Sequence, residues 1–270
     1  MTEKEFLEGY DANNYDRPSV AVDVLIFSIS PENNLEVLLV NRKEHPFKDA
    51  LALPGGFVGK NENLEDTAKR VIKEKVGIED IELEQLYTFG KIERDPRTRV
   101  ISIAYMAFLP NKIGNIENAF WYEIDFKDDK LKLMSSGIYV PEIPVEDLKK
   151  ALKIIKSVQY KLNQNIQVLE ENFELKLAFD HEEIIKLAIN RLRGKVDYTD
   201  IGFNLLKDKN NFTAFDLQKV FEAIKGEKLD KPNFRRWFFN TYLKSGKVVE
   251  NGKNSKNVKT YKYVGGLANE

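Results

Sequence analysis

The sequence contains no cysteine and only two histidines, His45 and His181, among its 270 residues. Disulfides and cysteine-based zinc sites are therefore excluded, and so is a histidine-rich metal site. No apolar run of about 18 residues is present that could span a bilayer. The N-terminal stretch MTEKEFLEGYDANN also lacks the apolar segment of a signal peptide. We therefore expect a cytoplasmic protein with no membrane association.

The formal net charge is only −1, but charge is unevenly distributed along the chain. From His181 to the end, 18 Lys and Arg face 11 Asp and Glu, a balance of +7, which leaves 24 against 32, or −8, before it. After Leu229, 9 basic residues face 3 acidic ones. A basic C-terminal part favours an anionic partner such as a nucleic acid, with a solvated basic surface as the alternative interpretation.

The length and the 42% hydrophobic content are typical of two globular domains, which we expect at residues 1–175 and 176–270. The first part has the pattern of a mixed α/β domain. Strands are predicted at 19–27, 35–41, 82–91, 100–109 and 118–125, with a short apolar run at 50–58 that bends at Pro-Gly-Gly. A helix is predicted at 62–76, because apolar residues recur at helical spacing and Gly77 follows as a C-cap. Residues 126–180 look irregular apart from a possible helix at 145–159, and we expect inserted hairpin structure or a long connection there.

The second part is predicted to be helical and then β. Helices are expected at 181–192, at 213–225 behind a capping box of Thr213 and Asp216, and at 230–243. The last of these would start at Asp230 or Lys231, with Pro232 in its first turn. Two β-like runs, 247–250 and 258–264, flank the polar tip 251–257. This order is the layout of a winged helix-turn-helix domain.

One motif in the first part carries specific chemical information. It is the spacing Gly56-x5-Glu62-x7-Arg70, which follows Leu53-Pro-Gly-Gly-Phe57. In this stretch the sequence resembles the Nudix family, whose box is G-x5-E-x7-R-E-U-x-E-E-x-G-U, where U is aliphatic. Seven of the nine defined positions match: Gly56, Glu62, Arg70, Ile72, Glu74, Gly77 and Ile78. An amphipathic helix with this spacing by chance is the alternative interpretation.

The two positions that fail to match are the ones on which hydrolysis depends. The resemblance implies glutamates at 71 and 75, where this chain has Val71 and Lys75, four residues apart on one helix face. In active Nudix enzymes that pair holds Mg²⁺, which requires oxygen ligands, against a pyrophosphate. We therefore expect no catalytic residues and no required cofactor. Mg²⁺ would matter only for residual hydrolysis, with Glu65, Asp66 or Asp95 as substitute ligands.

We expect the ligand-binding pocket to be retained although its hydrolase activity is lost. Residues 44–57 and 93–99 would lie near the cleft, and the second stretch holds Arg94, Arg97 and Arg99 within six residues. Arginine forks suit phosphates and carboxylates, although a charged turn between strands is the alternative. The predicted ligand-binding residues are Arg42, Phe57, Glu74, Asp95, Arg97 and Arg99, around the degenerate box of Gly56, Glu62, Arg70 and Glu74.

Beyond the box, most of the chain resembles the Nudix-related transcriptional regulators, which join a Nudix domain to a C-terminal winged helix. The similar stretches, within 15–110 and 178–264, include Asp95-Pro-Arg97, Phe179-Asp-His181 and Asp230-Lys-Pro-Asn-Phe-Arg-Arg236. The resemblance implies an α+β fold, in which an α/β/α sandwich with a mixed sheet precedes the winged helix. One branch of the family regulates NAD metabolism and senses ADP-ribose, and another regulates sugar metabolism and senses arabinose. The effector, a nucleotide or a sugar, stays open.

As a regulator, the protein would bind a double-stranded DNA operator as a homodimer, because two-fold operators match two-fold proteins. The helix at 232–243 would enter the major groove, and its N-terminal end carries the candidates Lys231, Asn233, Arg235 and Arg236. Lysines of the hairpin would contact phosphates: Lys253 and Lys256, with Lys247 and Lys259 beside them. The alternatives are an ADP-ribose pyrophosphatase with residual Mg²⁺-dependent activity and a protein-binding adaptor.

Overall fold

The computed structural model describes residues 1–11, 14–79, 81–112, 116, 118–135 and 176–265. The possible helix at 145–159 lies outside these ranges. Among the helices inside them, none is both long and apolar enough to cross a membrane. The first is α1 (Glu3–Gly9), a short helix capped by Thr2, with no buried residue.

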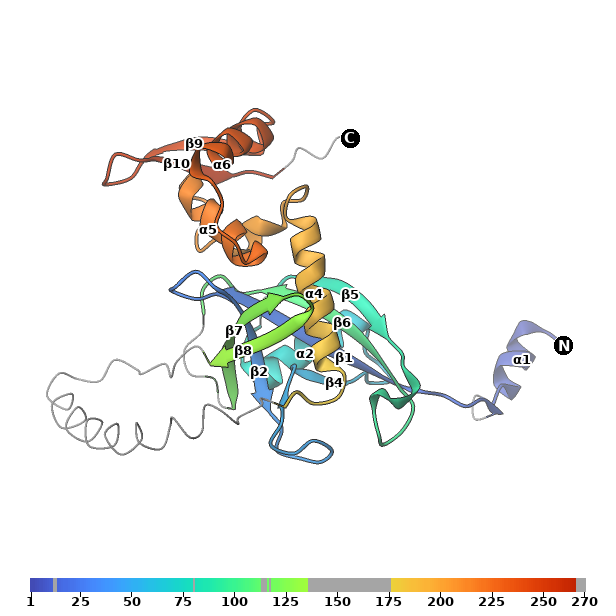
Figure 1. The fold of residues 1–270 in the computed structure, drawn as a ribbon. Coiled ribbons are helices and arrows are strands. Elements are labelled where there is room, and N and C mark those ends of the chain that lie inside the picture. Colours follow the sequence, from blue (N-terminus) through green and yellow to red (C-terminus); the bar gives the residue numbers. More distant parts are fainter. Residues whose placement is uncertain (12–13, 80, 113–115, 117, 136–175, 266–270) are drawn as a thin grey trace, which may run out of the picture.

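A mixed sheet forms the centre of the first unit (Figure 1). The main path runs β5 (Leu83–Phe89), β6 (Val100–Phe108), β1 (Ser19–Ile29), β2 (Leu35–Asn41), β7 (Ala119–Lys127) and β8 (Lys130–Ser135). The short strands β3 (Leu51–Ala52) and β4 (Gly55–Phe57) pair with β2 and β1. Strands β1 and β6 run parallel and the other pairs antiparallel, which confirms the predicted mixed sheet. Strand β8 was not predicted as a strand, although inserted hairpin structure was one expectation for 126–180, and β3 and β4 lie within the apolar run at 50–58.

Two helices cover the two faces of this sheet, and Figure 1 shows α4 (His181–Lys195) crossing one face with α2 (Leu64–Val76) behind the other. Strand β1 is buried on both sides: Val22, Val24 and Ile26 pack in the α2 layer, whereas Leu25 and Phe27 pack in the α4 layer. Such burial explains why its sequence is a nearly continuous apolar run. Helix α2 ends at Gly77, whose φ of 75° suits the glycine predicted as its C-cap.

The chain segment that leads into α4 also belongs to the sheet layer. The Leu51 amide donates to the Lys176 carbonyl (3.0 Å), and the Ala178 amide donates to the Leu51 carbonyl (2.8 Å). The apolar face of α4, with Ile184, Ile185 and Ala188, joins the same core cluster as β1 and β2. Helix α4 is therefore the second helical layer of the sandwich, although the predicted division at 175 and 176 assigned it to the second domain.

The remaining elements form a winged helix. After the 3-10 helix η3 (Ile201–Leu205) come α5 (Ala214–Lys225), α6 (Lys231–Phe238), a π-helical turn η4 (Phe239–Leu243), and the hairpin of β9 (Val248–Lys253) and β10 (Lys259–Tyr263). Both predicted helix starts are confirmed. Thr213 and Asp216 form a capping box, and Asp230 accepts a hydrogen bond from the Asn233 amide (3.0 Å) as the N-cap of α6.

Aromatic rings fill the centre of this second unit. Phe221 contacts Phe234 and Trp237 at ring-centroid distances of 5.4 and 5.0 Å, and Trp237 contacts Tyr242 at 5.2 Å, all edge to face. Such tilted pairs add stabilisation beyond the area they bury. They fix α6 against α5, so that the charged side of α6 faces outward.

Candidate functional site

A cavity of about 950 Å³ opens beside the Pro-Gly-Gly bend, between the sheet, the C-terminal half of α2 and the N-terminus of α4. Five of the six predicted ligand-binding residues line it: Arg42, Phe57, Glu74, Asp95 and Arg97. Arg99 is not among the lining residues, because its Nη1 donates to the Lys91 carbonyl (2.9 Å) outside the cavity. Whether the five contact a ligand stays a prediction.

The two glycines of the bend are required by close approach of the chain. A Cβ on Gly55 would lie 2.4 Å from the Asp23 Oδ1 atom and 2.9 Å from the Val22 carbonyl oxygen. A Cβ on Gly56 would lie 2.9 Å from Cγ2 of Val71. Only glycine fits at such distances. The bend is thus seated against β1 on one side and α2 on the other.

Arg70 binds both Glu62 and Glu74, and these box residues hold the loop that precedes α2. Glu62 accepts from Arg70 Nε (2.6 Å) and Nη2 (2.9 Å), and also from the Gly59 amide (3.0 Å) and the Thr67 hydroxyl (3.0 Å). Arg70, followed by the Gly59 amide, lowers the pKa of Glu62 to about 2. Arg70 also donates to the Phe57 carbonyl (3.1 Å) and to Glu74 (3.3 Å). These residues are structural in this arrangement.

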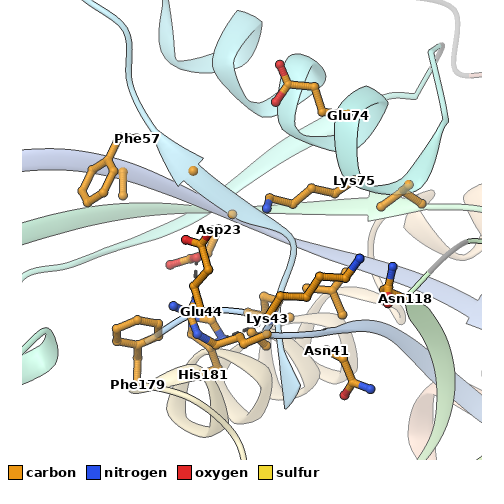
Figure 2. Close-up of a pocket in the computed structure, with 18 of the residues that line it drawn as sticks. Asp23, Asn41, Lys43, Glu44, Phe57, Glu74, Lys75, Asn118, Phe179 and His181 are labelled. Carbon is orange, nitrogen blue, oxygen red and sulfur yellow. Dashed lines mark hydrogen bonds and ion pairs between the residues drawn. The ribbon is translucent and has the colours of Figure 1, made fainter. Parts of the chain in front are cut away.

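The donor set at positions 71 and 75 does not fit Mg²⁺. Val71 is only 1% exposed and packs under Gly56, so the first carboxylate position is filled with hydrocarbon. Figure 2 shows Lys75 extending toward the cavity, while the Glu74 carboxylate points away from the other labelled residues. Among the residues that the structure describes, no group of three or more acidic or histidine side chains could hold a metal ion. Of the proposed substitute ligands, Asp66 accepts from Asn63 (2.8 Å) and Asp95 accepts from Arg97 (2.7 Å).

A buried ion-pair network lies at the floor of the cavity. Arg94, at the end of the 3-10 helix η2 (Ile92–Arg94), donates to both oxygens of Asp180 (2.9 and 2.7 Å) and to Asp23 (3.3 Å). Its side chain is 4% exposed. The sequence analysis grouped Arg94 with Arg97 and Arg99 as ligand-recognising arginines, but its guanidinium is bound within the protein. It connects β1 to the residue that precedes α4.

His181 completes this network from the first turn of α4. Its Nδ1 accepts a hydrogen bond from the Leu53 amide (2.9 Å), so the ring proton is on Nε2, which lies 3.5 Å from Asp23 Oδ1. Burial raises the pKa of Asp23, but His181, the Ser102 hydroxyl and Arg94 outweigh burial and hold that pKa below its ordinary value. The bend, β1 and α4 are therefore fixed together by buried polar contacts.

Phe179 lines the cavity directly beside this network and was not among the predicted site residues. Its backbone φ is 54°, and its ring lies 4.8 Å from the guanidinium carbon of Arg42 and 5.8 Å from that of Arg97. Burial, together with the charge of Arg97, lowers the pKa of Arg42. Two like charges flanking one ring favour an anion in the adjacent space. The sequence signal for Phe179 was its place in the family-like stretch Phe179-Asp-His181.

The predicted DNA-contacting residues lie on the outer surface of the winged helix. On α6 the exposed residues are Lys231, Asn233, Arg235 and Arg236, and on the hairpin they are Lys253 and Lys256. Neither Arg235 nor Arg236 makes an ion pair within the described ranges. The two further lysines predicted to contact phosphates are paired with carboxylates of the protein. Lys247 lies at its base, bound to Asp200 (3.0 Å), and Lys259 is paired with Glu250 (2.7 Å).

Comparison with known proteins finds a matching family model for each of the two units. The NUDIX domain model matches residues 18–130, and the model of the NrtR DNA-binding winged helix domain matches residues 202–263. The chain is 31% identical over 251 residues to the "ADPR responsive transcriptional repressor NtrR" of Acinetobacter baylyi, covering 92% of this chain and 82% of that one.

Two solved structures are similar over nearly the whole chain. A MutT/nudix family protein from Enterococcus faecalis superposes with a TM-score of 0.71 at 26% identity, covering 97% of this chain and 94% of that one. The NrtR of Shewanella oneidensis gives a TM-score of 0.62 at 26% identity, covering 91% and 94%. The similarity therefore extends over both units and the connection between them.

Proposed function

The chain belongs to the family of Nudix-related transcriptional regulators, and from this premise we propose that it is a DNA-binding repressor whose operator affinity responds to ADP-ribose bound in the cavity. The similar repressor from Acinetobacter baylyi is described as ADPR responsive, and the match covers both units. A sugar such as L-arabinose is the second candidate effector. The repressor would act as a homodimer on a two-fold operator.

The main observation that supports this proposal is that α4 extends from the cavity to the winged helix. At its N-terminal end Phe179 and His181 line the cavity, and Asp180 binds the cavity-lining Arg94. Near its C-terminal end, Arg193 donates to the Ile224 carbonyl at the end of α5 (3.1 Å) and to the Phe126 carbonyl of β7 (3.0 Å). A helix of 15 residues is about 22 Å long, so one rigid element joins the ligand site to the winged helix. A ligand that shifts the first end can reorient the second.

The cavity suits a nucleotide with a diphosphate. Phe57 lines it with nearly half of its surface exposed, which suits stacking with a base, and Arg97 lies 5.5 Å from that ring. Arg42 and Arg97 supply forked donors for phosphate oxygens. Hydrolysis of this ligand is not expected, because hydrocarbon and a cation occupy the two positions where Mg²⁺ ligands are needed.

In the winged helix, α6 would enter the major groove with Arg235 and Arg236 near base edges and phosphates, while Lys253 and Lys256 of the hairpin would contact phosphates. Both arginines are exposed, whereas the α6 residues Phe234 and Phe238 are buried. Their exposure without an ion pair in the described part of the protein supports an anionic partner for this surface.

The test is binding of the full chain to a duplex from its own upstream region, measured by fluorescence anisotropy over a range of salt concentrations. The variant R235A/R236A should bind at least about tenfold more weakly, and its salt slope should be smaller by about 2 if both arginines contact phosphate. The matched control is K130A/K132A, which removes two exposed cations from β8, a strand of the sheet that lies apart from α6 in Figure 1. It should bind like the unaltered protein.

Effector specificity is tested in the same assay, with ADP-ribose and L-arabinose added separately. ADP-ribose should change operator affinity, and an effect of arabinose alone would assign the sugar instead. Equal binding by R235A/R236A and the unaltered protein would contradict the role of α6. Mg²⁺-dependent turnover of ADP-ribose at about 1–1000 per second would contradict the expectation, drawn from Val71 and Lys75, that this ligand is not hydrolysed.

A further inference from the structure

Lys75 is the cation that stands in the cavity at a position where a Nudix enzyme has a metal-binding glutamate. It lies in the last turn of α2, four residues after Val71 and therefore on the same helix face. Its side chain is exposed and lines the cavity, and its ammonium group points toward the space enclosed by the labelled residues in Figure 2. Within the described ranges Lys75 makes no hydrogen bond or ion pair, whereas its neighbour Lys73 is bound to Glu79 (2.9 Å).

The acidic side chains around the cavity are mostly committed to other cations. Asp23 is bound by Arg94 and Ser102, Asp95 by Arg97, and Glu74 by Arg70. The fourth, Glu44, faces Arg42: burial and the charge of Arg97 lower the pKa of Arg42, and the Glu44 carboxylate offsets part of that lowering. Lys75 thus presents a positive charge with three donors to the same cavity that Arg42 and Arg97 line.

We propose that Lys75 binds the diphosphate of the effector directly, in the place that Mg²⁺ takes in the hydrolases, so that the effector binds without a metal ion. This inference rests on the proposed function for the identity of the ligand. A lysine ammonium neutralises phosphate charge and donates hydrogen bonds, but it cannot generate a metal-bound hydroxide. The residue that holds the diphosphate in this site therefore also keeps it from being cleaved.

A purely structural role for Lys75 makes a different prediction. A cation in the last turn of a helix interacts favourably with the helix dipole, and this effect would change stability without changing affinity. Lys73 lies in the same turn and lines the same cavity, but its charge is paired with Glu79. It is therefore the matched control for a cation at this helix end.

The experiment is calorimetric titration of the full chain with ADP-ribose, once in EDTA and once in Mg²⁺, for the unaltered protein and for K75R, K75M, K75E and K73M. The unaltered protein should bind equally in both buffers, within about twofold. Loss of one charge-assisted contact is about a tenfold effect, so K75M should bind about ten times more weakly. K75R should stay near the unaltered protein, and K75E in EDTA should be weaker still than K75M. K73M should be unchanged.

Four outcomes would overturn the inference, and they are distinguishable. Loss of binding in EDTA by the unaltered protein would show that a metal is required. Equal affinities of K75M and the unaltered protein, or equal losses in K75M and K73M, would show that Lys75 does not contact the ligand. If the unaltered protein binds no ADP-ribose in either buffer, the proposed effector is wrong and the inference fails with it.

Discussion

Replacing Arg94 by methionine keeps most of the side-chain volume but removes the cation shared by Asp23 and Asp180. The three side chains are 4%, 9% and 8% exposed, so water cannot compensate the loss. Removing one partner of a buried ion pair costs about 3–5 kcal/mol, because charges are left buried without a partner. We take about 3 kcal/mol, since His181 and Ser102 still contact Asp23.

For a domain of this size, about 3 kcal/mol corresponds to a fall in Tm of about 6–12 °C. The matched control is Arg97→Met, which also removes one cation and one ion pair. Arg97 is 44% exposed, so its pair with Asp95 contributes less than about 1 kcal/mol and the Tm should fall by less than about 4 °C. Thermal unfolding followed by circular dichroism measures both. A Tm of Arg94→Met within about 3 °C of the unaltered protein would refute the reasoning.

The pH dependence supplies a second check. The pKa of Asp23 is lowered in the folded protein, so its ion pair stabilises the fold above the unfolded pKa of about 3.9 and is lost as the pH falls through the folded pKa. Arg94→Met removes one cause of the lowering. The difference in stability between the two proteins should therefore be largest near neutral pH and narrow below about pH 4. A difference that widens on acidification would contradict the buried pair.

Two further substitutions test local geometry, each by urea denaturation. Gly55→Ala should lower the free energy of unfolding by about 1–3 kcal/mol, because the new Cβ would clash with the Asp23 carboxylate and the Val22 carbonyl. An unchanged free energy of unfolding would show that the bend can move away from β1. Thr213→Ala removes the capping box of α5 and should lower the free energy of unfolding by about 1 kcal/mol. Thr213→Ser keeps the hydroxyl and should retain most of the capping stabilisation. Equal losses in the two variants would argue against the hydroxyl as the cap.

Regular structure could be predicted wherever a local pattern determines it. The apolar run of β1, the capping residues Thr213 and Asp230, and the glycine after α2 all act through neighbours in sequence, and the structure has an element at each of these places. Strand β8 was not recognised as a strand because none of its apolar residues is fully buried: Leu131 and Leu133 are partly buried and Met134 is exposed. Helix α1 was missed because it buries no residue, so no apolar stripe marks it.

The site was less predictable, because its contacts join residues far apart in the chain. The three arginines of 94–99 look equivalent in sequence, yet Arg94 is bound to Asp180, Arg97 lines the cavity and Arg99 lies outside it. What separates them is the position of Asp180, 86 residues further on. The contact of His181 with the Leu53 amide spans 128 residues and likewise has no local signal.

Because α4 packs on the sheet and also contacts the winged helix, the two units cannot be divided at residue 175 without exposing buried contacts. A fragment that ends at residue 175 lacks the helix against which Leu25 and Phe27 pack, together with the Asp180 and His181 partners of the cavity floor. A fragment that begins there keeps α4 but leaves its apolar face without a sheet. Exchange of winged helices between relatives would therefore succeed only with a junction after α4. Each sheet would then keep the helix that packs on it.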